Sequence, residues 1–146
     1  MNARSSWLGR AARGALIVAG LLPVLVFALG RVPGLAGVAR FLDGWFAFQC
    51  ERDPARTLGL GGTMLPVCVR CLGIYLGLGL GALVLRPRLK VWPLRIWVGV
   101  ASVLMLADVG SEFLGFRPAW APLRLMTGIL LAYPVGSSLV WAARGA

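Results

Sequence analysis

The sequence predicts an all-α fold, namely an integral membrane four-helix bundle with an additional interfacial helix in its first loop. Hydrophobic residues make up 59% of the 146 residues and charged residues only 14%, and the mean hydropathy is +0.83. Soluble domains carry about 25% charged residues, so this chain has too few charges to cover a water-facing surface. The same composition excludes an intrinsically disordered chain, which has low hydrophobicity.

Four apolar stretches meet the length of about 20 residues that a helix needs to cross a bilayer. None shows the alternation of polar and apolar residues that is typical of barrel strands, and only helices otherwise satisfy every backbone group in lipid. We expect the helices at approximately residues 14–30, 67–85, 91–114 and 122–143 of a single transmembrane domain, 1–146.

The segment before the first stretch is basic, with Arg4, Arg10 and Arg13. A basic segment before an apolar run is also typical of a cleaved signal peptide, for which Ala28 and Gly30 would supply the small residues at the cleavage site. The stretch is long enough to span a bilayer, which favours a retained helix. Both interpretations leave a membrane protein.

The first loop, residues 31–66, is predicted to contain the interfacial helix at approximately residues 36–48. Its apolar residues recur at helical spacing, which suits a helix lying on the bilayer with an aromatic side chain at headgroup level. These residues are Val38, Phe41, Leu42, Trp45 and Phe46. A re-entrant or core-capping helix is the alternative. Residues 58–63 (LGLGGT) are predicted to form a flexible turn. Their glycines lack the lysine and spacing of a phosphate-binding loop.

The formal net charge of +10 is interpreted as arginine next to the membrane that attracts anionic lipid headgroups. Nucleic-acid binding is not expected, because it needs basic residues on one soluble face. Basic residues are nearly balanced between the two sides, but the dense cluster RPRLK at residues 86–90 favours both termini in the cytoplasm. We therefore expect an integral protein of the bacterial inner membrane.

Polar residues of the predicted spans gather on one side of the membrane. The start of the second helix, the end of the third and the start of the fourth must all lie on that side, whichever way the protein is oriented in the membrane. The residues are Arg70, Asp108, Glu112, Arg117, Arg124 and Thr127. Asp108 and Glu112 share one helix face at i, i+4 spacing. Intramembrane charges usually pair with one another, so ion pairing is the first interpretation, and a polar pocket for a substrate, an ion or a proton path is the second.

All three cysteines, Cys50, Cys68 and Cys71, are expected on that same side. A C-x-x-C pair that opens a helix brings two sulfurs within reach of one metal or one disulfide, and the helix N-terminus with Arg70 nearby lowers a thiol pKa. Three thiolates with a carboxylate from Glu51 would form a tetrahedral site for zinc or another thiophilic metal. Asp53 could replace Glu51, since the chain has no histidine. Packing, or one structural disulfide with a spare thiol, is the alternative.

Small residues at four-residue spacing occur in the second and fourth predicted spans. Such faces let helix backbones approach closely in lipid, so we interpret them as helix-packing seams. They are Gly73, Gly77, Gly81, Gly128, Ala132 and Gly136.

The order of these motifs resembles the bacterial membrane-protein family called domain of unknown function 2085. The resemblance covers residues 49–136 and depends on Cys50, PVCVRCLGIYLG at 66–77, Asp108, GFR at 115–117 and LRLMTG at 123–128. It implies a helical membrane protein and supplies no established activity. The family's first cysteine is typically followed by a histidine that resembles a fourth metal ligand, and here that position is Glu51. The asparagine usual three residues before the arginine of the fourth helix is Ala121.

The chain is also similar, more weakly, to the bacterial disulfide-bond formation membrane proteins. They too have four helices and a C-x-x-C at the outer end of the second, followed by an Ile-Tyr pair like Ile74 and Tyr75. Those enzymes pass electrons through a second cysteine pair, and this chain has only Cys50 left, which excludes a two-disulfide relay.

The sequence therefore predicts a multi-pass membrane protein with a cysteine site at the membrane surface. Metal binding without enzymatic activity is favoured over a thiol-disulfide oxidoreductase and over a structural subunit with no chemistry of its own. The expected partner is the lipid bilayer, and a homo-oligomer or a membrane partner protein stays open.

Overall fold

The computed structural model describes residues 3–84, 90–116, 118 and 120–145. Helices dominate this part of the chain, which confirms the all-α membrane-type fold. The helices are α1 (Ala3–Leu29), α2 (Ala36–Ala47), α3 (Val69–Leu83), α4 (Val91–Phe113) and α5 (Ala121–Gly145), with a short 3-10 helix η1 (Pro54–Arg56). A two-stranded hairpin, β1 (Gly59–Leu60) and β2 (Thr63–Met64), lies between η1 and α3.

Three of the described helices are long and apolar enough to cross a membrane. They contain the candidate spans Trp7–Leu29, Val91–Phe113 and Ala121–Arg144. The second expected span is shorter than the predicted 67–85, because Cys68 and Val84 both have extended backbone and limit α3 to 15 residues. At a rise of about 1.5 Å per residue, α3 extends only about 22 Å, less than the hydrocarbon core of a typical bilayer.

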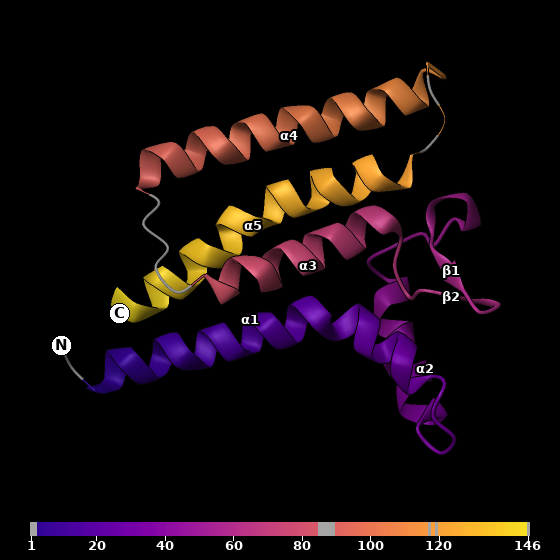
Figure 1. The fold of residues 1–146 in the computed structure, drawn as a ribbon, viewed down its shortest axis with the longest axis horizontal. Helices are drawn as coiled ribbons and strands as arrows, with labels where there is room; N and C mark the ends of the chain where they lie inside the picture. The colour runs from indigo at the N-terminus through magenta and orange to yellow at the C-terminus, as the bar shows by residue number, and fades with distance from the viewer. Residues whose placement is uncertain (1–2, 85–89, 117, 119, 146) are drawn as a thin grey trace.

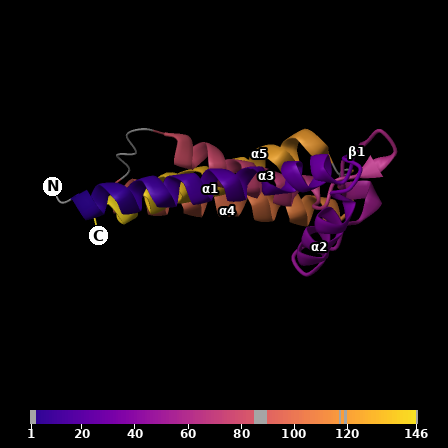
Figure 2. The same cartoon turned by 90° about the horizontal axis from the view of Figure 1, so that it is seen from below.

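The short helix α3 lies in the middle of the bundle, between α1 and α5, while α4 packs on the far side of α5 (Figure 1). Both termini lie at one end of the bundle, and α2 and the hairpin lie at the other (Figure 1). Seen from below, α2 turns away from the direction of the long helices (Figure 2). The three cysteines belong to this second end, because Cys50 follows α2 and Cys68 precedes α3.

Glycines allow α3 and α5 to pack with their backbones in contact. A Cβ atom added to Gly77 would lie 2.8 Å from the carbonyl oxygen of Ile129, and one added to Gly81 would collide with the carbonyl oxygen of Tyr133. Gly73 and Gly128 face each other in the same way. A further contact joins α1 to α3, where a Cβ on Gly20 would lie 2.7 Å from the Cα of Gly79.

The end of the bundle that carries the cysteines has its own small core. Phe46 of α2 is fully buried there, next to residues of α1, the loop before α3, and α3 itself. The cluster consists of Val26, Phe46, Leu65, Val67 and Leu72. Leu42 is half-buried and packs against this cluster, whereas Val38, Phe41 and Trp45 are exposed, so α2 presents one apolar face to the core and another outward.

A hairpin replaces the flexible turn that we expected at residues 58–63. Gly61 and Gly62 both have positive φ, 59° and 77°, as a two-residue hairpin turn of type I′ requires. The strands have only two residues each, too few to produce a recognisable alternation. Arg31, just after α1, holds the hairpin through hydrogen bonds to the Leu60 carbonyl (2.5 Å) and the Thr63 hydroxyl (2.9 Å).

Candidate functional site

The three cysteines come together where the loop after α2 meets the start of α3. Their sulfur atoms all lie within 4.8 Å of one another, and each residue is partly buried. The backbone N–H of Cys68 donates a hydrogen bond to the sulfur of Cys50 at 3.1 Å. Cys68 is the residue just before α3 and Cys71 is in its first turn, so the C-x-x-C spacing places both sulfurs on the side that faces Cys50.

Cys50 reaches this position because the end of α2 is fastened to α3. The backbone N–H of Cys50 donates to the Phe46 carbonyl at 3.0 Å, and the buried Phe46 ring packs edge-on against Tyr75, with 5.6 Å between ring centroids. The Tyr75 hydroxyl donates to Oε1 of Gln49 at 2.5 Å. Sequence analysis did not identify Gln49 as part of this link, since nothing in its local pattern distinguishes it from a surface glutamine.

Cys68 is the thiol best prepared to ionise. A hydrogen bond from the Cys71 side chain, assisted by the backbone N–H groups of Cys71 and Arg70, lowers the pKa of Cys68 to about 5, against the opposing effect of burial. Thiolates, not thiols, are the metal ligands and the nucleophiles. The arrangement therefore stabilises a negative sulfur next to two further sulfurs.

The three sulfurs fit a thiophilic metal ion. A zinc–sulfur distance of about 2.3 Å in a tetrahedron places ligand sulfurs about 3.8 Å apart, so small side-chain rotations would suffice. Glu51, the expected fourth ligand, is exposed and its carboxylate is not part of the group of mutually close ligand atoms. Asp53 caps η1 instead, accepting a hydrogen bond from the Ala55 N–H and pairing with Arg56. The described chain thus offers three sulfur ligands.

A chain of ion pairs lies beside the cysteines. Nη2 of Arg70, which is within the C-x-x-C turn, lies 2.6 Å from Oδ2 of Asp108 on α4. Arg124 at the start of α5 pairs with Glu112, which also binds Arg56 at 3.1 Å. The side chains of Asp108 and Arg124 are 2% and 3% exposed, so each carries a charge out of water and needs its partner.

These pairs bring together four of the six residues that were predicted to form the polar cluster. Thr127 is buried next to them, but its hydroxyl donates to the Arg124 carbonyl at 3.1 Å within α5. Arg117 lies outside the described residues. Arg56 joins the cluster from the loop, and sequence analysis missed it because a loop arginine has no helical register that would indicate its neighbours.

A family model described as "predicted membrane protein (DUF2085)" matches residues 50–137, more than half of the chain. One relative is an uncharacterised protein of Methanocaldococcus jannaschii, 27% identical over 62% of this chain and 60% of its own length. Another, from Methanothermobacter thermautotrophicus, also uncharacterised, is 53% identical over 58% of this chain and 78% of its own length. The chain thus spans less than two thirds of the first relative, and both relatives are archaeal. No solved structure matches.

Proposed function

The chain belongs to the family of predicted membrane proteins called domain of unknown function 2085, and from this premise we propose that Cys50, Cys68 and Cys71 bind one thiophilic metal ion. Zinc is the metal that such ligands suit best. One observation carries the proposal: the three sulfur atoms lie within 4.8 Å of one another, although Cys68 and Cys71 follow Cys50 by 18 and 21 positions in the sequence.

Bound metal would add a clamp between two segments that already pack together through Phe46 and Tyr75. Cys50 belongs to the loop after α2, and the other two sulfurs belong to the start of α3. Metal binding that exists only in the folded protein adds its binding free energy to stability. The hydrogen bond from the Cys68 N–H to the Cys50 sulfur supports this function, because backbone N–H groups commonly stabilise a sulfur that carries negative charge.

Metal analysis of the detergent-purified full chain tests the proposal. We expect about one zinc per chain and a large loss of zinc in each of the variants Cys50→Ser, Cys68→Ser and Cys71→Ser. Glu51→Gln is the matched control and should keep its metal, because the Glu51 carboxylate is not part of the ligand group. Less than a tenth of an equivalent of any transition metal in the unmodified protein would exclude the proposal.

Thiol counting on the same samples distinguishes the two alternatives. One free thiol with a reducible bond between Cys68 and Cys71 would indicate a thiol-disulfide protein, since a C-x-x-C pair at a helix N-terminus is suited to that chemistry. Three free thiols without metal would indicate that the cysteines only pack and that the protein is a structural or partner subunit.

We propose further that both termini face the cytoplasm and that the cysteine end faces the opposite side of a cytoplasmic membrane. The two termini lie at the end of the bundle away from the cysteines, and the basic cluster at residues 86–90 supports their cytoplasmic position. A reporter fused after Gly62 tests this orientation. An alkaline phosphatase fusion at this position is expected to be active. A fluorescent green fluorescent protein fusion at the same position would show that the protein has the opposite orientation.

A further inference from the structure

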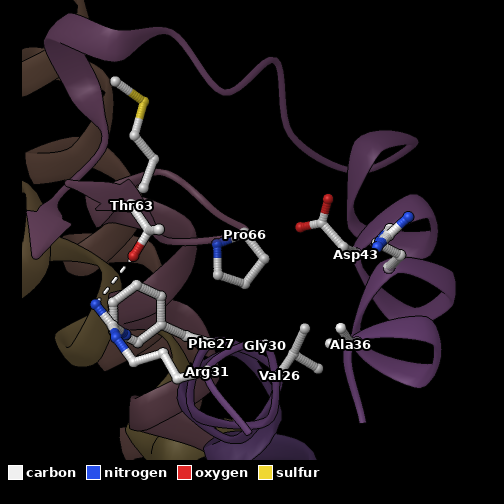
Figure 3. Close-up of a pocket in the computed structure, with 11 residues that line it drawn as sticks. Val26, Phe27, Gly30, Arg31, Ala36, Asp43, Thr63 and Pro66 are labelled. Carbon is white, nitrogen blue, oxygen red and sulfur yellow. Dashed lines mark hydrogen bonds between the residues drawn. The ribbon is translucent and has the colours of Figure 1, made fainter. Parts of the chain in front are cut away.

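A pocket of about 470 Å³ lies where the end of α1 meets α2 and the hairpin, and its mostly apolar lining includes the polar side chains of Arg31, Arg40, Asp43 and Thr63. Figure 3 shows Arg31 and Thr63 on one side of it and Asp43 on the other, with Val26 and Pro66 between them. Arg31 lies just after Leu29, the last residue of the candidate span Trp7–Leu29. If α1 crosses a bilayer, this pocket lies at the level of the lipid headgroups.

The charge of the pocket favours an anion. The Arg31 guanidinium is fixed over the Phe27 ring, 3.7 Å from its centroid, and donates to the Thr63 hydroxyl. Arg40 also lines the pocket and is exposed. The opposing carboxylate, that of Asp43, is paired with Arg52 at 2.9 Å. This pair carries no net charge, so the positive charges of Arg31 and Arg40 leave the pocket cationic overall.

A second hollow, of about 620 Å³, runs along α2 beside Leu22 of α1 and meets the first at Arg40, which lines both. Its other residues are almost all apolar and include Leu22, Trp45 and Phe48. Trp45 is 62% exposed and Phe48 92%. A cationic pocket that continues into an apolar groove matches a molecule with a phosphate at one end and a hydrocarbon chain at the other.

We propose that this pocket and groove bind one anionic phospholipid. Its phosphate would lie between Arg31 and Arg40, and an acyl chain would cover the exposed side of α2. The site is separate from the cysteine cluster and does not depend on metal binding. The proposed site differs from a general attraction of arginines to anionic headgroups, because lipid binding should depend on one particular arginine, Arg40 on α2.

Native mass spectrometry of the full chain in detergent tests the site. Dioleoyl phosphatidylglycerol is titrated against the unmodified protein, the variant Arg40→Gln and the matched control Arg95→Gln. Arg95 is an exposed arginine of α4 outside both hollows. A charge-assisted hydrogen bond lost from a phosphate weakens binding by about tenfold. We therefore expect about a tenfold weaker first binding event in Arg40→Gln and no change in Arg95→Gln.

Two further ligands test the two halves of the proposed site. Dioleoyl phosphatidylcholine should bind more weakly than phosphatidylglycerol, because it carries no net charge. Inorganic phosphate at millimolar concentration should not displace the lipid, because it cannot occupy the groove.

Three results would overturn the proposal. Equal losses in both arginine variants would show only a general effect of net charge, and equal binding of phosphatidylcholine would exclude recognition of the anionic headgroup. Displacement of the lipid by phosphate would assign the pocket to a free phosphate compound. Arg40 is exposed and makes no ion pair with the described residues, so Arg40→Gln should fold normally, which a melting curve checks.

Discussion

Arg70 and Asp108, 38 positions apart in the chain, form an ion pair of 2.6 Å inside the bundle. Arg70 is the third residue of the C-x-x-C motif, and Asp108 is on α4, which packs chiefly against α5. The pair therefore connects the turn that carries two of the cysteines to the outermost helix. Any rotation of α3 that moved Cys68 and Cys71 away from Cys50 would also pull Arg70 away from its partner.

Replacement of Asp108 by Asn should strongly destabilise the protein. Removal of one member of a fully buried ion pair typically costs about 3–5 kcal/mol, because the other charge stays buried without compensation. The Arg70 side chain is 16% exposed, so the loss should lie toward the lower end of this range. Arg70→Gln should destabilise in the same direction. The double variant should be clearly more stable than the sum of the two single effects predicts, because it leaves neither charge behind. Unfolding titrations in detergent micelles measure this cycle, and strictly additive effects would show that the two residues do not act as a pair.

Gly81→Ala tests the contact between α3 and α5. The new methyl group would collide with the Tyr133 carbonyl oxygen, and backbone cannot move aside as a flexible side chain can. Overpacking of this kind costs about 1–3 kcal/mol. Gly99→Ala, on α4, is the matched control, because a Cβ at Gly99 meets nothing within 4 Å. The melting temperature should fall in the first variant and stay unchanged or rise in the second. Equal melting temperatures would contradict the close approach of the two helices at this glycine.

The sequence predicted the membrane class and its helical nature, because long apolar runs in lipid permit few other structures. It placed the start of the first helix at residue 14, whereas α1 begins at Ala3. It also predicted that charges entering the spans would gather on one side, since the order of the helices requires this. It did not predict the two ends of α3, which depend on the extended backbone of Cys68 at its start and of Val84 at its end.

The partners of individual residues were harder to predict than the helices. Arg56 reaches Glu112 and Gln49 reaches Tyr75 from loops whose course only tertiary contacts define. Gly79 was also missed as a packing residue, because the four-residue spacing from Gly73 to Gly81 passes over it. Its partner is Gly20 on α1, which belongs to no run of small residues at that spacing, because Leu16 and Val24 lie four residues before and after it.

The contact between Gly20 and Gly79 should respond unequally to substitution of its two members. A Cβ on Gly20 would lie 2.7 Å from the Gly79 Cα and 2.8 Å from the Tyr75 carbonyl oxygen, whereas a Cβ on Gly79 would lie 3.3 Å from the Gly20 Cα. The first is a collision with backbone and the second is a tight contact. Gly20→Ala should therefore lower the melting temperature more than Gly79→Ala does. The reverse order would show that α1 approaches α3 at a different register.

Arg31 should control the order of the hairpin. Its guanidinium donates to the Leu60 carbonyl and to the Thr63 hydroxyl, on either side of the turn at Gly61 and Gly62. In Arg31→Gln the glutamine side chain is too short to keep both hydrogen bonds. An exposed loop that loses its attachment opens more often and is cleaved faster. Limited digestion with proteinase K should cut this variant between residues 58 and 65 several times faster than the unmodified protein. Arg95→Gln, an exposed arginine on α4, should be cut at the original rate. If Arg31→Gln is also cut at that rate, the two-residue strands and their turn hold the hairpin without help from α1.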